Sequence, residues 1–139
     1  MTDDNVPANT IEKGRRRTIK EFLTKHGRSY FKDFYKDEVE NDQRRSAKTW
    51  EWIKQLANRH RILNTQKFRK LKGEIYELKP TRQLRYLGFF YGKEEKVWKR
   101  DCFIITHGFK KQSQKTPRKE IKRARNCRKR FLINLNKGG

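Results

Sequence analysis

The hydrophobic pattern in the first half of the chain predicts two amphipathic helices. Aromatic side chains recur at helical spacing between residues 29 and 38, which indicates a short helix with Ser29 as its N-cap. A longer apolar stripe predicts a second helix over Glu40–Asn58, and its members are Ala47, Trp50, Ile53, Leu56 and Ala57. Because a small sheet needs a helix to cover it, the stripe indicates core rather than a binding groove.

The pattern changes to the spacing of strands in the second half. Ile75–Lys79 alternates until Pro80, and Leu84–Tyr91 is rich in residues that favour strands. A turn follows at residues 92–96. Asp101–Phe109 is apolar on both faces, which predicts a central strand. The short connections favour antiparallel neighbours.

Both ends of the chain are less regular. Residues 1–14 mix Asp, Asn, Pro and Gly, which predicts a flexible tail, and residues 16–24 fit a strand and a helix equally well. A final helix is expected to start with Thr116 as its cap and Pro117 at its first helical position. We expect one domain over residues 15–133, followed by a second flexible tail over 134–139.

Charge is what composition adds to this picture. The chain has 139 residues, with 38 Lys and Arg against 16 Asp and Glu, and a formal net charge of +22. Half of that net charge falls in residues 110–139, where Glu120 is the single acidic residue. Such a balance calls for a polyanionic partner, most often nucleic acid. Ribosomal proteins, DNA-binding proteins and ribonucleases are the classes that fit, and aromatic residues at 12% favour a folded domain over a disordered arm.

The two cysteines, Cys102 and Cys127, have neither CxxC nor paired-histidine spacing, so no zinc site or other metal site is expected. No cofactor is expected either. The N-terminal sequence lacks the apolar core of a secretory signal, and no run is long enough to span a membrane. We therefore expect a cytoplasmic protein with reduced thiols and no membrane partner.

The exit of the strand 101–109 places a histidine beside phosphate-binding charge. His107 can titrate near neutrality and serve as a general acid or base, or it can be a satisfied core histidine that orients the following loop. It shares an alternating register with Phe103, Ile105 and Phe109, which predicts that all four lie on one side of the strand. The lysines that follow supply charge for phosphate, although such a run is more often a solvated face.

Several ordered motifs then carry a resemblance to a known family. They are Phe68–Lys79, Arg85 within an aromatic strand, His107–Lys111, Gln114–Pro117 and Glu120–Ile121. Together they resemble the RelE/HigB superfamily of toxins, and within it the phage-derived killer-protein branch, over roughly residues 18–131. Lys79 differs from the pattern, because an arginine is more common at the end of the family's Glu-Leu-Arg motif.

This resemblance implies a toxin of a type II toxin–antitoxin pair, usually a ribosome-dependent endoribonuclease that cuts mRNA and stops translation and growth. Its implied partners are mRNA on the ribosome and a cognate antitoxin, expected to be a helix-turn-helix protein. The implied fold is a compact α+β domain, in which N-terminal helices cover one face of a curved antiparallel sheet and a basic helix ends the chain. The family's first strand would make residues 16–24 a strand.

The resemblance also suggests site residues for a metal-independent reaction. Arg85 is the expected phosphate clamp, since a guanidinium fork grips two phosphate oxygens. Its alternative is a surface arginine in a salt bridge. Lys79, His107 and Lys110 are the other expected catalytic residues. The expected RNA-binding residues are Lys111, Lys115, Arg82, Lys119 and Lys122.

Two other classes of protein fit the same charge. One is a non-catalytic module that binds RNA or the ribosome, in which the lysines hold phosphate and His107 only packs. The other is a phage-type DNA-binding protein that uses the final basic helix. Affinity for either nucleic acid would fall steeply with added salt.

Overall fold

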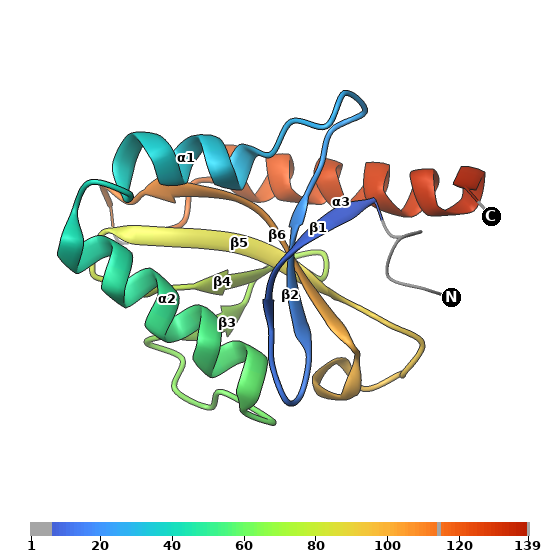
Figure 1. Cartoon of the computed structure of the whole chain (residues 1–139), viewed down its shortest axis with the longest axis horizontal. Coiled ribbons are helices and arrows are strands. Elements are labelled where there is room, and N and C mark those ends of the chain that lie inside the picture. The colour runs from blue at the N-terminus through green and yellow to red at the C-terminus, as the bar shows by residue number, and fades with distance from the viewer. Residues whose placement is uncertain (1–6, 114, 139) are drawn as a thin grey trace.

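The computed structural model describes residues 7–113 and 115–138 (Figure 1). In this range the chain forms six strands, three α-helices and one short 3-10 helix. In chain order they are β1 (Ala8–Lys13), β2 (Thr18–Phe22), α1 (Tyr30–Glu38), α2 (Gln43–Asn58), β3 (Phe68–Lys70), β4 (Tyr76–Leu78), β5 (Leu84–Tyr91), η2 (Val97–Lys99), β6 (Cys102–Lys110) and α3 (Arg118–Gly138). The expected α+β class is confirmed.

The six strands form one mixed sheet in the order β1-β2-β6-β5-β4-β3. The expectation of an antiparallel sheet was wrong at one pair, because β2 runs parallel to β6, with Thr18 opposite Cys102. Short connections predict only local neighbours, whereas β2 pairs with a strand some eighty residues later. The central position expected for residues 101–109 is confirmed, since β6 lies between β2 and β5.

Helices cover both faces of the sheet. On one face, α1 and α2 pack through Phe31, Ile53 and Leu56 against strand residues that include Phe103. On the other face, α3 packs through Ala124, Cys127 and Phe131 against strand residues that include Phe89 and Ile104. The N-terminal helices therefore share one face as expected, and the basic C-terminal helix closes the opposite one (Figure 1).

The two helices predicted in the first half of the chain are confirmed as α1 and α2. Ser29 caps α1 by accepting a hydrogen bond from the Lys32 backbone amide at 3.0 Å. Asp42 caps α2 in the same way, so α2 begins three residues later than expected, at Gln43. Within the described part of the chain, no helix is both long enough and apolar enough to cross a membrane.

The predictions for both ends require correction. The strand expected over residues 16–24 is β2, but a further strand, β1, occupies residues 8–13 of the expected N-terminal tail. The pattern missed β1 because it is a largely polar edge strand held by its pairing with β2. At the other end, α3 runs on to Gly138 through most of the expected tail 134–139. Residues 1–6 and 139 lie outside the described residues.

A β-bulge changes which side of β6 its last residues occupy. Leu87 pairs with His107, but the next residue, Gly88, pairs with Ile105, so Thr106 is the extra residue. A bulge reverses the alternation of side chains beyond it. His107 and Phe109 therefore lie on the α3 face, whereas Phe103 and Ile105 lie on the α1 and α2 face. The expectation that all four share one side was wrong.

Candidate functional site

A buried carboxylate, Glu77 of β4, is the centre of a cluster of charged residues on the α3 face. Its side chain is fully shielded from solvent, and Arg69 of β3 donates from Nε to its Oε1 at 3.0 Å. Thr116 donates its hydroxyl proton to Oε2, and Arg69 also donates from Nη2 to the Thr116 hydroxyl at 3.3 Å. Glu77 therefore ties the β3–β4 hairpin to the loop that precedes α3.

Thr116 was expected to cap α3, and that expectation was wrong. Its hydroxyl is committed to Glu77, and the first turn closes through the Pro117 carbonyl, which accepts from the Glu120 amide at 3.0 Å. Pro117 was expected at the first helical position, but α3 begins at Arg118, so Pro117 lies just before the helix and supplies only its carbonyl oxygen. The N-terminus of α3, where the helix dipole is positive, lies at Arg118, two residues after Thr116.

Arg85 of β5 completes the inner part of the cluster. Its side chain is only 7% exposed, and its Nε lies 3.9 Å from Glu77 Oε2 without a hydrogen bond among the described residues. Its Nη1 donates to the Thr81 and Leu84 carbonyl oxygens, at 2.9 and 2.8 Å. Burial lowers the pKa of Arg85, an effect that Glu77 opposes. Arg85 is therefore a buried arginine that contributes positive charge to the cluster from beneath the protein surface.

Two lysines form the outer part of the cluster. Lys79 follows β4, Lys111 follows β6, and both are half-buried. Burial lowers the pKa of Lys79, and Arg69 lowers it further. Burial also lowers the pKa of Lys111, and Arg85 adds to the effect. Four cations thus surround one carboxylate, and the excess positive charge makes the cluster a candidate site for a phosphate.

His107 is sealed inside the protein beside this cluster. Its side chain is 1% exposed, and its Nε2 lies 3.2 Å from Glu120 Oε1 in the first turn of α3. Its Nδ1 lies 3.0 Å from the Thr106 hydroxyl. Burial lowers the pKa of His107, which favours a neutral ring that donates from Nε2 to Glu120. Because both ring nitrogens have partners, His107 positions the start of α3 and does not face solvent.

This arrangement predicts a pH dependence of stability. Because the pKa of His107 is lowered below its ordinary 6.5, the unfolded state binds more protons than the folded state just below that pH. Stability should therefore fall between about pH 7 and pH 5. The pKa of Glu120 is lowered by its hydrogen bond to His107, so its contribution is lost only at more acidic pH.

The measurement is thermal denaturation of wild type and His107→Gln across this range. His107→Gln should show a shallower fall in melting temperature between pH 7 and pH 5, whatever its stability at pH 7. His26→Gln, which removes an exposed histidine, is the matched control and should follow wild type. Identical slopes for His107→Gln and wild type would contradict the role assigned to His107.

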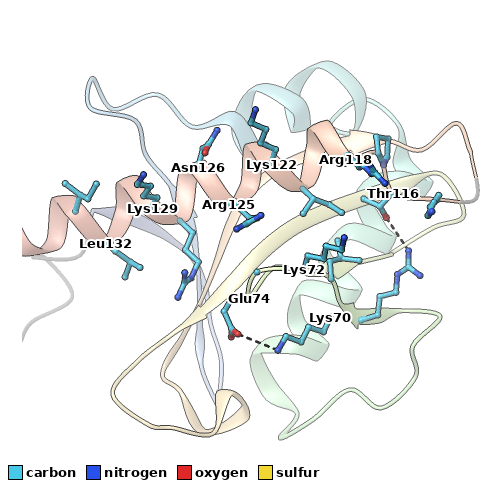
Figure 2. Close-up of a pocket in the computed structure, with 18 of the residues that line it drawn as sticks. Lys70, Lys72, Glu74, Thr116, Arg118, Lys122, Arg125, Asn126, Lys129 and Leu132 are labelled. Atoms are coloured by element: carbon cyan, nitrogen blue, oxygen red, sulfur yellow. Dashed lines mark hydrogen bonds and ion pairs between the residues drawn. The ribbon is translucent and has the colours of Figure 1, made fainter.

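The remaining expected site residues are spread over the surface. Lys110 is on the α1 side of β6, where its Nζ lies 3.0 Å from Glu38 Oε2, so the structure separates it from the neighbouring Lys111. Arg82 is exposed in the turn before β5. Lys115, Lys119 and Lys122 are also exposed. Lys122 projects from the side of α3 that is turned away from the β3–β4 turn, as Figure 2 shows.

Sequence reasoning named Arg85, Lys79 and Lys111 but missed Arg69 and Glu77. Both were contained in the quoted Phe68–Lys79 motif, and their spacing across a short hairpin could have paired them. In the structure Arg69 is indeed the register partner of Glu77. The burial of Glu77 carries no local signal, since it depends on α3 covering this face.

Comparison with known families places the chain in one of them. A family model described as "Phage derived protein Gp49-like (DUF891)" matches residues 36–129, which run from the end of α1 through most of α3. The matched range includes the whole Glu77 cluster and excludes β1 and β2. No curated protein matches the sequence. Because the match covers well over half of the chain, this protein belongs to the Gp49-like family of phage-derived proteins.

Proposed function

We propose that this protein is the toxin of a type II toxin–antitoxin pair, and that it acts in the cytoplasm as a metal-independent endoribonuclease on ribosome-bound mRNA. The observation that carries the proposal is the Glu77 cluster, in which four cations surround one buried carboxylate. Membership of a phage-derived family is compatible with a toxin of this kind.

The cluster suits the charge that develops when RNA is cleaved without a metal ion. Such cleavage needs the 2′-hydroxyl to lose a proton, the leaving 5′-oxygen to gain one, and the phosphorane charge to be stabilised. In our proposal Arg69, which is 37% exposed, and Lys79 contact the phosphate. Arg85 is buried beneath them and stabilises the phosphate charge through its electrostatic field. Glu77 and two backbone carbonyl oxygens hold its guanidinium in place.

Lys111 is our candidate for proton transfer. Its lowered pKa brings a neutral amine closer to physiological pH, which is what a lysine base requires. Lys79 is a weaker candidate, because the RelE/HigB toxins that the chain resembles more often have arginine there, and arginine does not release its proton. His107 acts as a positioning residue through Glu120, and Lys110 stays outside the chemistry because it pairs with Glu38 on the other face.

Induced expression is the direct test. Wild-type protein should stop growth and yield transcripts cut within codons, and co-expression of the adjacent gene product should relieve the arrest. A folded Lys79→Met/Lys111→Met protein should permit growth at equal expression. Intact mRNA and normal growth with folded wild-type protein would contradict the proposal.

A non-catalytic module that binds RNA or the ribosome is the second candidate. The observation that favours it is the burial of Arg85 and His107, two side chains expected to reach the substrate. Purified ribosomes carrying mRNA separate the two candidates. Binding without any cut product, with affinity that falls steeply with salt, would establish the binder.

A further inference from the structure

A cavity of about 320 Å³ lies where α3 passes the end of β2 and the start of α1. Phe22 of β2 and Tyr30 of α1 line one wall. The other wall is one face of α3, and its members are Lys119, Lys122, Arg123, Asn126, Cys127 and Arg130. None of these residues belongs to the Glu77 cluster, so the cavity is a separate site.

Positive charge dominates this cavity. Its cations are exposed residues of α3, namely Lys119, Lys122, Arg123 and Arg130. None of the four forms an ion pair within the part of the chain that the structure describes. The single acidic residue of α3, Glu120, is bound to His107 instead. Because like charges three and four residues apart on a helix repel, this face of α3 is suited to binding an anion.

Tyr30 holds one of these cations in a defined position. The guanidinium carbon of Arg123 lies 4.4 Å from the centre of the Tyr30 ring, which is a close cation–π contact. Tyr30 is itself supported by buried Phe22, with the two ring centres 6.4 Å apart and nearly parallel. Arg123 therefore presents its planar guanidinium in a preorganised geometry, which favours bidentate contact with a phosphate.

The size and charge of the cavity select the class of ligand. Its volume is at the small end of the range of about 300–1,000 Å³ that is typical of small-molecule sites. A terminal phosphate carries about −1.5 to −2 at pH 7, and each inner phosphate adds one more charge, so a triphosphate matches four cations. Single-stranded RNA carries one charge per nucleotide and is usually held by several stacking aromatic residues, whereas Tyr30 is the one partly exposed aromatic residue here.

We propose that this cavity binds a chain of linked phosphates, of the kind that a nucleoside triphosphate carries. Arg123 and the three other cations hold the phosphates. Asn126 supplies an amide that can both donate to and accept from the edge of a base, and Tyr30 supplies an apolar contact. Figure 2 shows Lys122 and Asn126 projecting from the side of α3 that is turned away from the β3–β4 turn, where this cavity lies. This binding is independent of the proposed function.

The test is isothermal titration calorimetry of full-length protein with ATP, without RNA or ribosomes. The buffer contains EDTA, so that Mg²⁺ does not shield the phosphates from the protein. AMP and inorganic triphosphate are titrated under the same conditions. ATP should bind at least about tenfold more tightly than AMP, because AMP lacks two of the phosphates that the cations contact. Inorganic triphosphate shows how much of the affinity comes from the phosphate chain alone.

Two matched double variants locate the contact. Lys119→Gln with Arg130→Gln removes two of the four cations and should weaken ATP binding at least about tenfold. Arg118→Gln with Lys129→Gln removes one arginine and one lysine from α3, each one position earlier and outside the cavity. Because this control loses the same net charge, its ATP affinity should change by less than about threefold. Circular dichroism establishes that both variants are folded.

Equal affinity for ATP and AMP, or equal effects of the two double variants, would overturn the proposal and leave only non-specific charge attraction. Inorganic triphosphate that binds as tightly as ATP would support the phosphate-chain site and identify inorganic polyphosphate as its ligand. A single-stranded RNA of about ten nucleotides that the cavity variant alone weakens, while ATP binding is unaffected, would overturn it in favour of an RNA contact. If wild type fails to cleave mRNA but ATP binding maps to Lys119 and Arg130, the proposed function falls and this proposal stands.

Discussion

Replacing Glu77 with alanine is expected to destabilise the protein by about 3–5 kcal/mol, the usual cost of removing one partner from a buried ion pair. Glu77 is fully buried and accepts hydrogen bonds from Arg69 and Thr116, with Arg85 beside it. Without the carboxylate, buried Arg85 keeps its charge among other cations. For a chain of this size the melting temperature should fall by roughly 10–20 °C.

The matched control is Glu95→Gln, at an exposed position in the loop after β5, which should change stability by less than about 0.5 kcal/mol. A double variant, Glu77→Leu with Arg85→Met, removes both buried charges and should recover much of the loss. A Glu77→Ala protein that melts within about 2 °C of wild type would contradict the central role of this carboxylate.

Replacing Lys111 with methionine is expected to lower the rate of mRNA cleavage by at least about 100-fold, the scale typical of losing one group that stabilises or serves the transition state. Lys79→Met should lower the rate by a similar factor, because it removes one of the positive charges that hold the phosphate. Both rates are measured on ribosomes carrying defined mRNA. This prediction rests on the proposed function.

Arginine substitutions separate charge from proton transfer. Lys79→Arg should retain most of the activity, since arginine keeps the positive charge on the phosphate. Lys111→Arg should be as inactive as Lys111→Met, because arginine cannot supply a neutral base. The cleavage rate of wild type should rise with pH until the lowered pKa of Lys111 is passed. The residual cleavage rate of Lys111→Arg should not show that rise. Full activity of Lys111→Arg would reduce Lys111 to a charge on the phosphate.

Lys110→Met gives the most informative comparison with Lys111→Met. The two lysines are adjacent in sequence, but Lys110 pairs with Glu38 on the α1 side of the sheet. If the Glu77 cluster is the site, Lys110→Met should change the rate little. Loss of activity in Lys110→Met with an active Lys111→Met would move the site to the opposite face.

Part of the candidate site was predictable because its residues occur in recognisable motifs. Arg85, Lys79 and Lys111 were named from the sequence, and the structure brings them together around Glu77. His107 and Lys110 were named for the same reason, but neither side chain is part of the Glu77 cluster. The bulge at Thr106 directs His107 towards α3, and strand alternation directs Lys110 and Lys111 to opposite faces. A motif gives the order of residues, not the direction of their side chains.

The sequence by itself determined the two capped helices, the apolar central strand and the large positive charge, because caps, periodicity and composition are local properties of the chain. Tertiary structure alone decided the parallel pairing of β2 with β6, the burial of Glu77 and the cavity between α3, β2 and α1. Each of these depends on contacts between segments far apart in sequence. The physical reason is that burial and the electrostatic field of a charge depend on which elements pack against it, and local spacing carries no record of that packing.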